Sequence, residues 1–174
     1  IATKERLEVL SLMADPKIPD GQEAWSVVEA VIGAGGVPVL PWAPGKWLFR
    51  RRRTVRKLLA AFEPTQLLIG DTTLRPARWG EPRLMKEARA RRFTVIAGTD
   101  PLPFPGEEDG IGRYGVAWTG EFDERQPIEA AKKAFLDPSC ALEVVGKRNP
   151  LRDVIWRLIR NRRVKKSGQM PGLM

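Results

Sequence analysis

The stretch Phe93-Thr-Val-Ile-Ala-Gly-Thr-Asp-Pro-Leu-Pro-Phe-Pro-Gly-Glu-Glu108 decides the fold class of this chain. A short apolar run ends in Gly98-Thr99-Asp100, and three prolines then hold the following segment extended. This pattern is typical of a buried strand that delivers a carboxylate to the open edge of a parallel sheet, where α/β proteins place their binding sites. The 174 residues include no histidine, so chemistry at this edge must use other side chains.

Short apolar runs recur at intervals of about 27–30 residues, which is the length of one strand-plus-helix unit. The runs cover residues 7–12, 36–40, 66–69 and 93–97. Helical periodicity lies between them, over residues 23–32, 47–62 and 83–91. This alternation predicts an α/β fold with a parallel sheet and right-handed crossovers. The residues expected to face inward from the helices include Trp25, Trp47, Val55, Leu58, Leu59 and Phe62.

The rhythm changes after Asp100. A loop rich in proline, glycine and acidic residues covers 101–110, and the sequence then predicts a strand over 113–119 and a helix over 127–136. Residues 150–166 form the clearest amphipathic helix, with an apolar stripe of Leu151, Val154, Ile155, Leu158 and Ile159. No linker-like segment divides the chain, so residues 1–174 are expected to form one domain.

The net charge of +9 is concentrated in Arg50–Arg53 and in residues 157–166. Two interpretations are open: these runs are solvated helix faces, or at least one of them binds an anionic partner. The single cysteine, Cys140, cannot form an internal disulfide, and no apolar run approaches the roughly 20 residues that span a bilayer. A cytoplasmic location is the expectation that follows.

Polar residues follow three of the expected strands. If the sheet is parallel, Trp42, Asp71 and Asp100 meet at one edge, with Arg75 and Arg78 on the loop after Asp71. Two carboxylates among arginines are suited to a divalent cation or to orienting a phosphate. The alternative is that both aspartates cap helices or pair structurally with the arginines.

A further candidate is Lys46, in the segment Pro44-Gly45-Lys46-Trp47 before a helix. Its ammonium group and the free backbone N–H groups at the helix start could together meet a phosphate.

These strand ends resemble the second half of the polymerase-and-histidinol-phosphatase (PHP) superfamily. The segment from Gly35 to Pro44 is similar to a family element in which Gly-Gly precedes a strand ending in His-Pro. The segments Leu67–Asp71 and Gly98–Leu102 are similar to the later strand ends of the family, and the resemblance covers about residues 7–120. It implies the C-terminal part of a distorted (βα)7 barrel whose ancestral chemistry is metal-dependent phosphoester hydrolysis.

The departures from the family pattern affect its metal ligands. The family's histidines are replaced, with Trp42 near one position and Leu102 at another. Only Asp100 carries over as a metal ligand, with Asp71 as an added candidate, and carboxylates alone suit magnesium or manganese better than the tight clusters of the family. The resemblance therefore implies a degenerate PHP-like protein, or catalysis that uses residues outside this segment.

The combined expectation is a site at the sheet edge in a PHP-like protein of uncertain activity. Asp100 and Asp71 would bind a divalent metal such as Mg, Mn or Zn. Arg75, Arg78 and Lys46 would hold the phosphate of a small molecule, and Trp42, Thr99 and Leu102 would line the site. The alternative is a non-catalytic protein whose basic helices, such as residues 150–166 or the Arg50–Arg53 face, dock to an anionic membrane, nucleic acid or protein.

A half-barrel would also leave sheet edges open. Self-association, or a partner segment that completes the barrel, is therefore expected.

Overall fold

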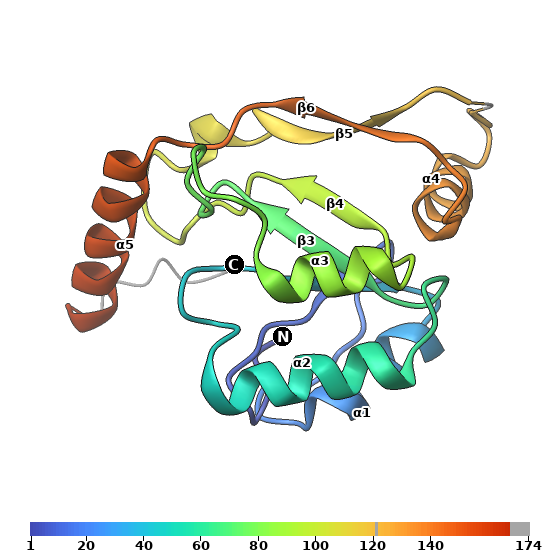
Figure 1. The fold of residues 1–174 in the computed structure, drawn as a ribbon, viewed down its shortest axis with the longest axis horizontal. Coiled ribbons are helices and arrows are strands. Elements are labelled where there is room, and N and C mark those ends of the chain that lie inside the picture. Colours follow the sequence, from blue (N-terminus) through green and yellow to red (C-terminus); the bar gives the residue numbers. More distant parts are fainter. Residues whose placement is uncertain (121, 168–174) are drawn as a thin grey trace.

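The computed structural model describes residues 1–120 and 122–167 and shows an α/β fold (Figure 1). A four-stranded sheet has the order β1-β2-β3-β4. Its strands are β1 (Leu10–Leu12), β2 (Val37–Pro41), β3 (Leu68–Thr72) and β4 (Val95–Gly98). The prediction of parallel strands is confirmed for β2, β3 and β4, whereas β1 pairs antiparallel with β2. In the described part of the chain this sheet stays open, with β1 and β4 at its edges.

Three helices connect the strands: α1 (Ala24–Gly33), α2 (Phe49–Ala61) and α3 (Arg83–Ala90). Together they bury one face of the sheet in a large apolar cluster, which includes Leu40, Ile69 and Val95 from the strands. The inward residues predicted on α2 and at its ends are confirmed as buried. Trp25 is different, because 43% of its surface is exposed and its ring lies beside Phe62. The buried residues of α1 are Ala24, Val27, Val28 and Val31. Trp25 lies outside that stripe.

The opposite face of the sheet carries a smaller core. Side chains alternate along each strand, so Val37, Val39 and Leu68 point away from α1, α2 and α3. They pack with Phe135 and Leu136 at the end of α4 (Pro127–Leu136). The helix predicted over 127–136 is therefore confirmed, with Pro127 as its first residue, and its last residues pack against this smaller core.

An antiparallel ribbon of β5 (Tyr114–Trp118) and β6 (Leu142–Gly146) lies beside β4 (Figure 1). The sequence predicted β5 and missed β6. Four of the five β6 residues are exposed, so the strand lacks the apolar alternation by which strands are recognised. A short 3₁₀ turn, Glu108–Gly110, precedes β5.

The last described helix is α5 (Leu151–Lys166), which stands beyond the carboxyl ends of β3 and β4 (Figure 1). Its predicted extent is confirmed, but its apolar stripe is divided. Val154 is buried and Leu158 is half-buried, whereas Leu151, Ile155 and Ile159 are 46–48% exposed. The stripe is divided because Arg157 takes the buried position beside Val154. No helix within residues 1–120 and 122–167 is long and apolar enough to cross a membrane.

Gly146 fixes the junction between β6 and the segment that leads to α5. Its φ is +82°, and a Cβ at this position would lie 1.9 Å from the carbonyl oxygen of Arg113. We predict that Gly146→Ala lowers the free energy of unfolding by more than about 1 kcal/mol, through both backbone strain and this clash.

Gly115, in the facing strand β5, provides a matched control, because a Cβ there meets nothing within 4 Å. Urea unfolding should show Gly115→Ala close to the unchanged protein. Equal stability of the two variants would contradict the described ribbon.

Candidate carboxyl-edge site

The carboxyl ends of β2, β3 and β4 come together, as the strand pattern predicted. The backbone N–H of Trp42 donates to the carbonyl of Gly70 at 2.8 Å, and the hydroxyl of Thr72 donates to the carbonyl of Trp42 at 3.1 Å. Thr73 reaches the next strand end, where its hydroxyl donates to the carbonyl of Thr99. These bonds make the loops after the three strands one connected surface, where α/β sheets bind ligands.

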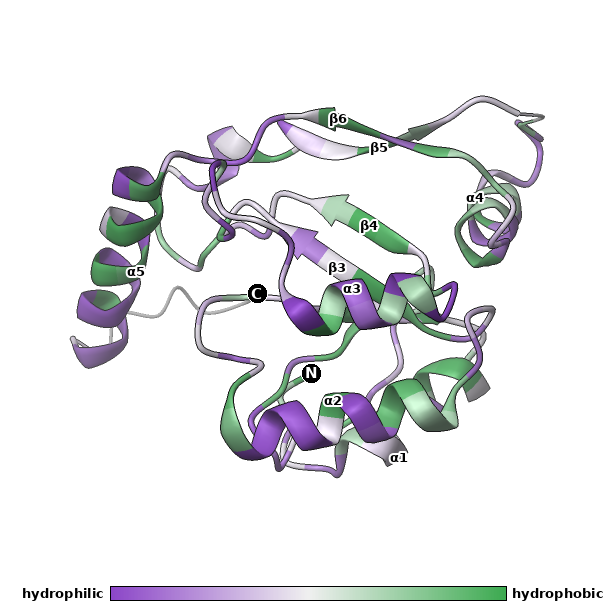
Figure 2. Cartoon of the chain, in the orientation of Figure 1, coloured by the Kyte–Doolittle hydropathy of each residue, from purple (hydrophilic) through white to green (hydrophobic). Residues whose placement is uncertain are grey.

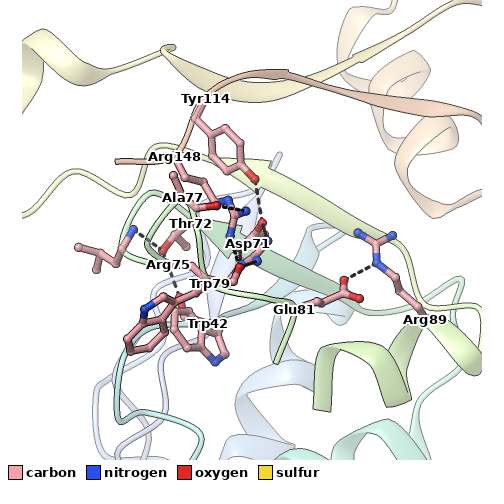
Figure 3. A network of polar contacts seen from close by, with 11 residues as sticks. Trp42, Asp71, Thr72, Arg75, Ala77, Trp79, Glu81, Arg89, Tyr114 and Arg148 are labelled. Atoms are coloured by element: carbon pink, nitrogen blue, oxygen red, sulfur yellow. Dashed lines mark hydrogen bonds and ion pairs between the residues drawn. The ribbon is translucent and has the colours of Figure 1, made fainter. Parts of the chain in front are cut away.

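Asp71 is held in a buried network at this edge (Figure 3). The guanidinium of Arg75 donates through Nε to Oδ1 at 2.7 Å and through Nη2 to Oδ2, and the hydroxyl of Tyr114 donates to Oδ2 at 2.8 Å. Arg75 also donates to the carbonyl of Trp79. Asp71 and Arg75 are 5% and 8% exposed, so this network matches the structural alternative considered for Asp71.

The buried network changes the pKa of the Tyr114 phenol. Burial raises its pKa to about 12, and the hydrogen bond to Asp71 adds to the shift, because both favour the neutral phenol. The ring comes from β5, so the contact fastens the β5–β6 ribbon to the end of β3.

Asp100 lies in a different environment from Asp71. It is half-buried, and its φ of +51° is uncommon for a residue with a side chain. Burial raises the pKa of its carboxyl group, and the nearby ammonium group of Lys46 opposes that increase. Lys46 itself forms an ion pair with Glu8, a residue that the sequence did not single out.

Arg157 of α5 reaches into the same edge and is only 6% exposed. Its guanidinium donates to the carboxylate of Glu107, with Nε 2.9 Å from both oxygens. It also donates to the hydroxyl of Thr73 at 2.8 Å and to the carbonyl of Asp100 at 3.1 Å. Glu107 in turn accepts the N–H of Leu102. The sequence placed Glu107 in a loop rich in proline, glycine and acidic residues, and the structure shows that its side chain is only 9% exposed.

A cavity of about 440 Å³ opens beside this arginine. It lies between the loops after β3 and β4, the ends of the β5–β6 ribbon and α5. The polar residues that line it are Thr73, Thr99, Glu107, Asp109, Arg113, Lys147, Asn149, Asp153 and Arg157, and the indole of Trp156 is also present.

The charged side chains that line the cavity are three cations, Arg113, Lys147 and Arg157, and three carboxylates, Glu107, Asp109 and Asp153. Arg157 is paired with Glu107, and Asp153 lies 3.2 Å from Arg152. Arg152 does not itself line the cavity, so the formal charges of the lining side chains balance. Among the described residues, neither Arg113 nor Lys147 forms an ion pair.

The predicted site residues are thus only partly brought together. Thr99 lines the cavity. Trp42 packs in the large apolar core at 8% exposure, Leu102 is half-buried, and Arg78 is exposed. Arg75 and Lys46 are paired with carboxylates.

The cations that line the cavity, Arg113 and Lys147, were missed by the sequence reading. Lys147 follows the unrecognised strand β6. Recognition of β6 would have placed the segment Lys147-Arg148-Asn149 at a strand end, and Lys147 could then have been identified as a site residue.

A divalent metal needs several oxygen, nitrogen or sulfur ligands gathered at one point. Within residues 1–120 and 122–167 no three His, Cys, Asp or Glu side chains are placed to share an ion. Both oxygens of Asp71 already accept hydrogen bonds from Arg75 and Tyr114. The described residues do not fit the metal cluster that the PHP resemblance implies.

Comparison of the chain with protein-family models, with curated proteins and with solved structures finds no significant match. The function proposed below therefore rests on the side chains that line the cavity.

The buried phenol gives a direct test of this edge. Tyr114 is the single tyrosine of the chain, so tyrosinate absorption reports on it alone. We expect a native pKa of about 12, against 10.0 for an unperturbed phenol. Because the folded pKa is the higher one, its contribution to stability is complete below pH 10. It is lost as the pH rises towards about 12, where the unfolded chain ionises first.

The tyrosinate absorption of the native protein should be measured immediately after a pH jump, before the protein unfolds. It should be compared with the tyrosinate absorption of the chain in denaturant at the same pH. Tyr114→Phe should lose the tyrosinate signal and this part of the alkaline loss of stability. A native midpoint equal to that of the denatured chain would contradict the buried contact with Asp71.

Proposed function

We propose that this protein binds a phosphorylated small molecule in the cavity at the carboxyl edge of its sheet. The observation that carries the proposal is the pair of cations, Arg113 and Lys147, that line the cavity without carboxylate partners among the described residues. Guanidinium and ammonium groups are the side chains that hold phosphate oxygens in proteins.

The remaining lining groups support a polar, hydroxylated ligand. The hydroxyls of Thr73 and Thr99 and the amide of Asn149 are able to orient sugar-like hydroxyl groups. The indole of Trp156 offers an apolar surface for a ring face. A volume of about 440 Å³ lies within the usual range for small-molecule sites and suits a sugar phosphate.

The proposal keeps the phosphate-binding part of the predicted function and reassigns its residues. Arg113 and Lys147 replace Arg75, Arg78 and Lys46 as phosphate ligands. In this proposal the chain is a degenerate relative of the PHP-like barrel, whose open sheet corresponds to the C-terminal part. Since the described donor groups do not fit the family's metal cluster, we propose binding without hydrolysis.

Calorimetric titration with glucose 6-phosphate, with glucose and with inorganic phosphate tests this proposal. Glucose 6-phosphate and inorganic phosphate should bind, and glucose alone should not. Arg113→Gln and Lys147→Gln should each weaken binding about tenfold or more, because each removes a charge-assisted hydrogen bond worth about 1.5–3 kcal/mol.

Lys86→Gln is the matched control, because Lys86 is an exposed cation on α3 outside the cavity. Lys86→Gln should bind glucose 6-phosphate as the unchanged protein does. After incubation of the unchanged protein with Mn²⁺, the glucose 6-phosphate should be recovered intact. Equal losses in all three variants, or binding of glucose alone, would contradict the assignment. Release of phosphate that requires Asp100 would favour the phosphoesterase function instead.

A further inference from the structure

The start of α2 exposes two adjacent apolar side chains, Leu48 and Phe49, which we call the apolar ridge. Leu48 is 51% exposed and Phe49 is 85% exposed. Phe49 also has a φ of +52°, which bulky residues rarely adopt. Little of the Phe49 ring is buried within the fold, and its backbone is strained, so the packing of the chain does not account for this residue.

The charges that follow the ridge are also unfavourable for folding. Arg50–Arg53 are the second to fifth residues of α2, at the end where the helix macrodipole is positive, and no acidic residue lies in the first turn. Among the described residues Arg50, Arg52 and Arg53 form no ion pair, while Arg56 is paired with Glu87. Local rules are broken most often where a segment serves binding, and this segment fits an anionic partner.

Cations line two hollows that share the ridge residues. One hollow of about 650 Å³ is lined by Leu48 and Phe49 together with four cations, one carboxylate and one hydroxyl: Lys4, Arg6, Arg50, Arg51, Glu5 and Thr54. A second, of about 430 Å³, is lined by the same two apolar residues and by Arg52, Arg53 and Arg56. Figure 2 shows the hydrophobic colour at the start of α2 followed directly by hydrophilic residues.

We propose that the apolar ridge and its arginines form a docking surface for an anionic lipid membrane. Leu48 and Phe49 enter the boundary between headgroups and acyl chains, and the arginines on either side contact lipid phosphates. This arrangement matches a bilayer surface, where an apolar layer lies beneath a layer of negative charge.

Single-stranded nucleic acid is a less suitable partner. It would also attract the arginines and could stack on Phe49. Leu48 has no π-face, however, and gains nothing from stacking, whereas burial in lipid removes both apolar side chains from water.

Vesicle flotation tests the proposal with the full chain. Vesicles of equal parts phosphatidylserine and phosphatidylcholine should bind the protein, and vesicles of phosphatidylcholine alone should not. Phe49→Asn should weaken binding about tenfold through the lost apolar contact. Asparagine tolerates a positive φ, so this variant should keep the melting temperature and the glucose 6-phosphate binding of the unchanged protein. Arg50→Gln and Arg53→Gln should each cost about fivefold and reduce the salt dependence.

Ile155→Ser is the matched control, because Ile155 is 48% exposed on the other arginine-rich helix, α5. It should bind vesicles as the unchanged protein does. The proposal is overturned if Ile155→Ser is as damaging as Phe49→Asn, or if Phe49→Asn binds normally. It is also overturned if the protein binds a single-stranded oligonucleotide through Phe49 and does not bind vesicles.

Discussion

The contact between Arg157 and Glu107 organises the carboxyl edge of this protein. One guanidinium joins α5 to Thr73 after β3 and to Asp100 and Glu107 after β4, across 84, 57 and 50 residues of chain. Both charged side chains are less than a tenth exposed, and removal of one partner from such a pair costs about 3–5 kcal/mol. Without it α5 would lose its main polar attachment, and the cavity would lose one wall.

A second pair, Arg75 with Asp71, joins the ribbon to the sheet through Tyr114. Together the two buried arginines pair with the carboxylates of Asp71 and Glu107, so these acidic groups help to hold the carboxyl edge together. The cations left for a ligand come from the ends of the β5–β6 ribbon, Arg113 and Lys147. The edge therefore keeps the position of an α/β binding site, and in our proposal these two cations bind the anionic group of its ligand.

Much of the fold was predictable because apolar periodicity is a local property. Helix ends were predicted within two residues, and the strand ends converge as expected. The exposed strand β6 carried too little of that signal to be recognised. The ion pair between Arg157 and Glu107 was not predictable. Arg157 lies in an arginine-rich helix, and only tertiary packing shows that it is buried. Likewise, nothing local distinguishes Glu107, whose side chain is only 9% exposed, from Glu108, which is exposed.

The central claim is that an anion binds between Arg113 and Lys147 beside the Arg157–Glu107 pair. Anomalous diffraction from crystals soaked in tungstate, a heavy analogue of phosphate, tests it most directly. The account predicts a peak in the cavity within hydrogen-bond reach of both cations. A peak only at Arg50–Arg53, or in contact with Asp100 and Lys46, would place the binding site elsewhere and contradict it.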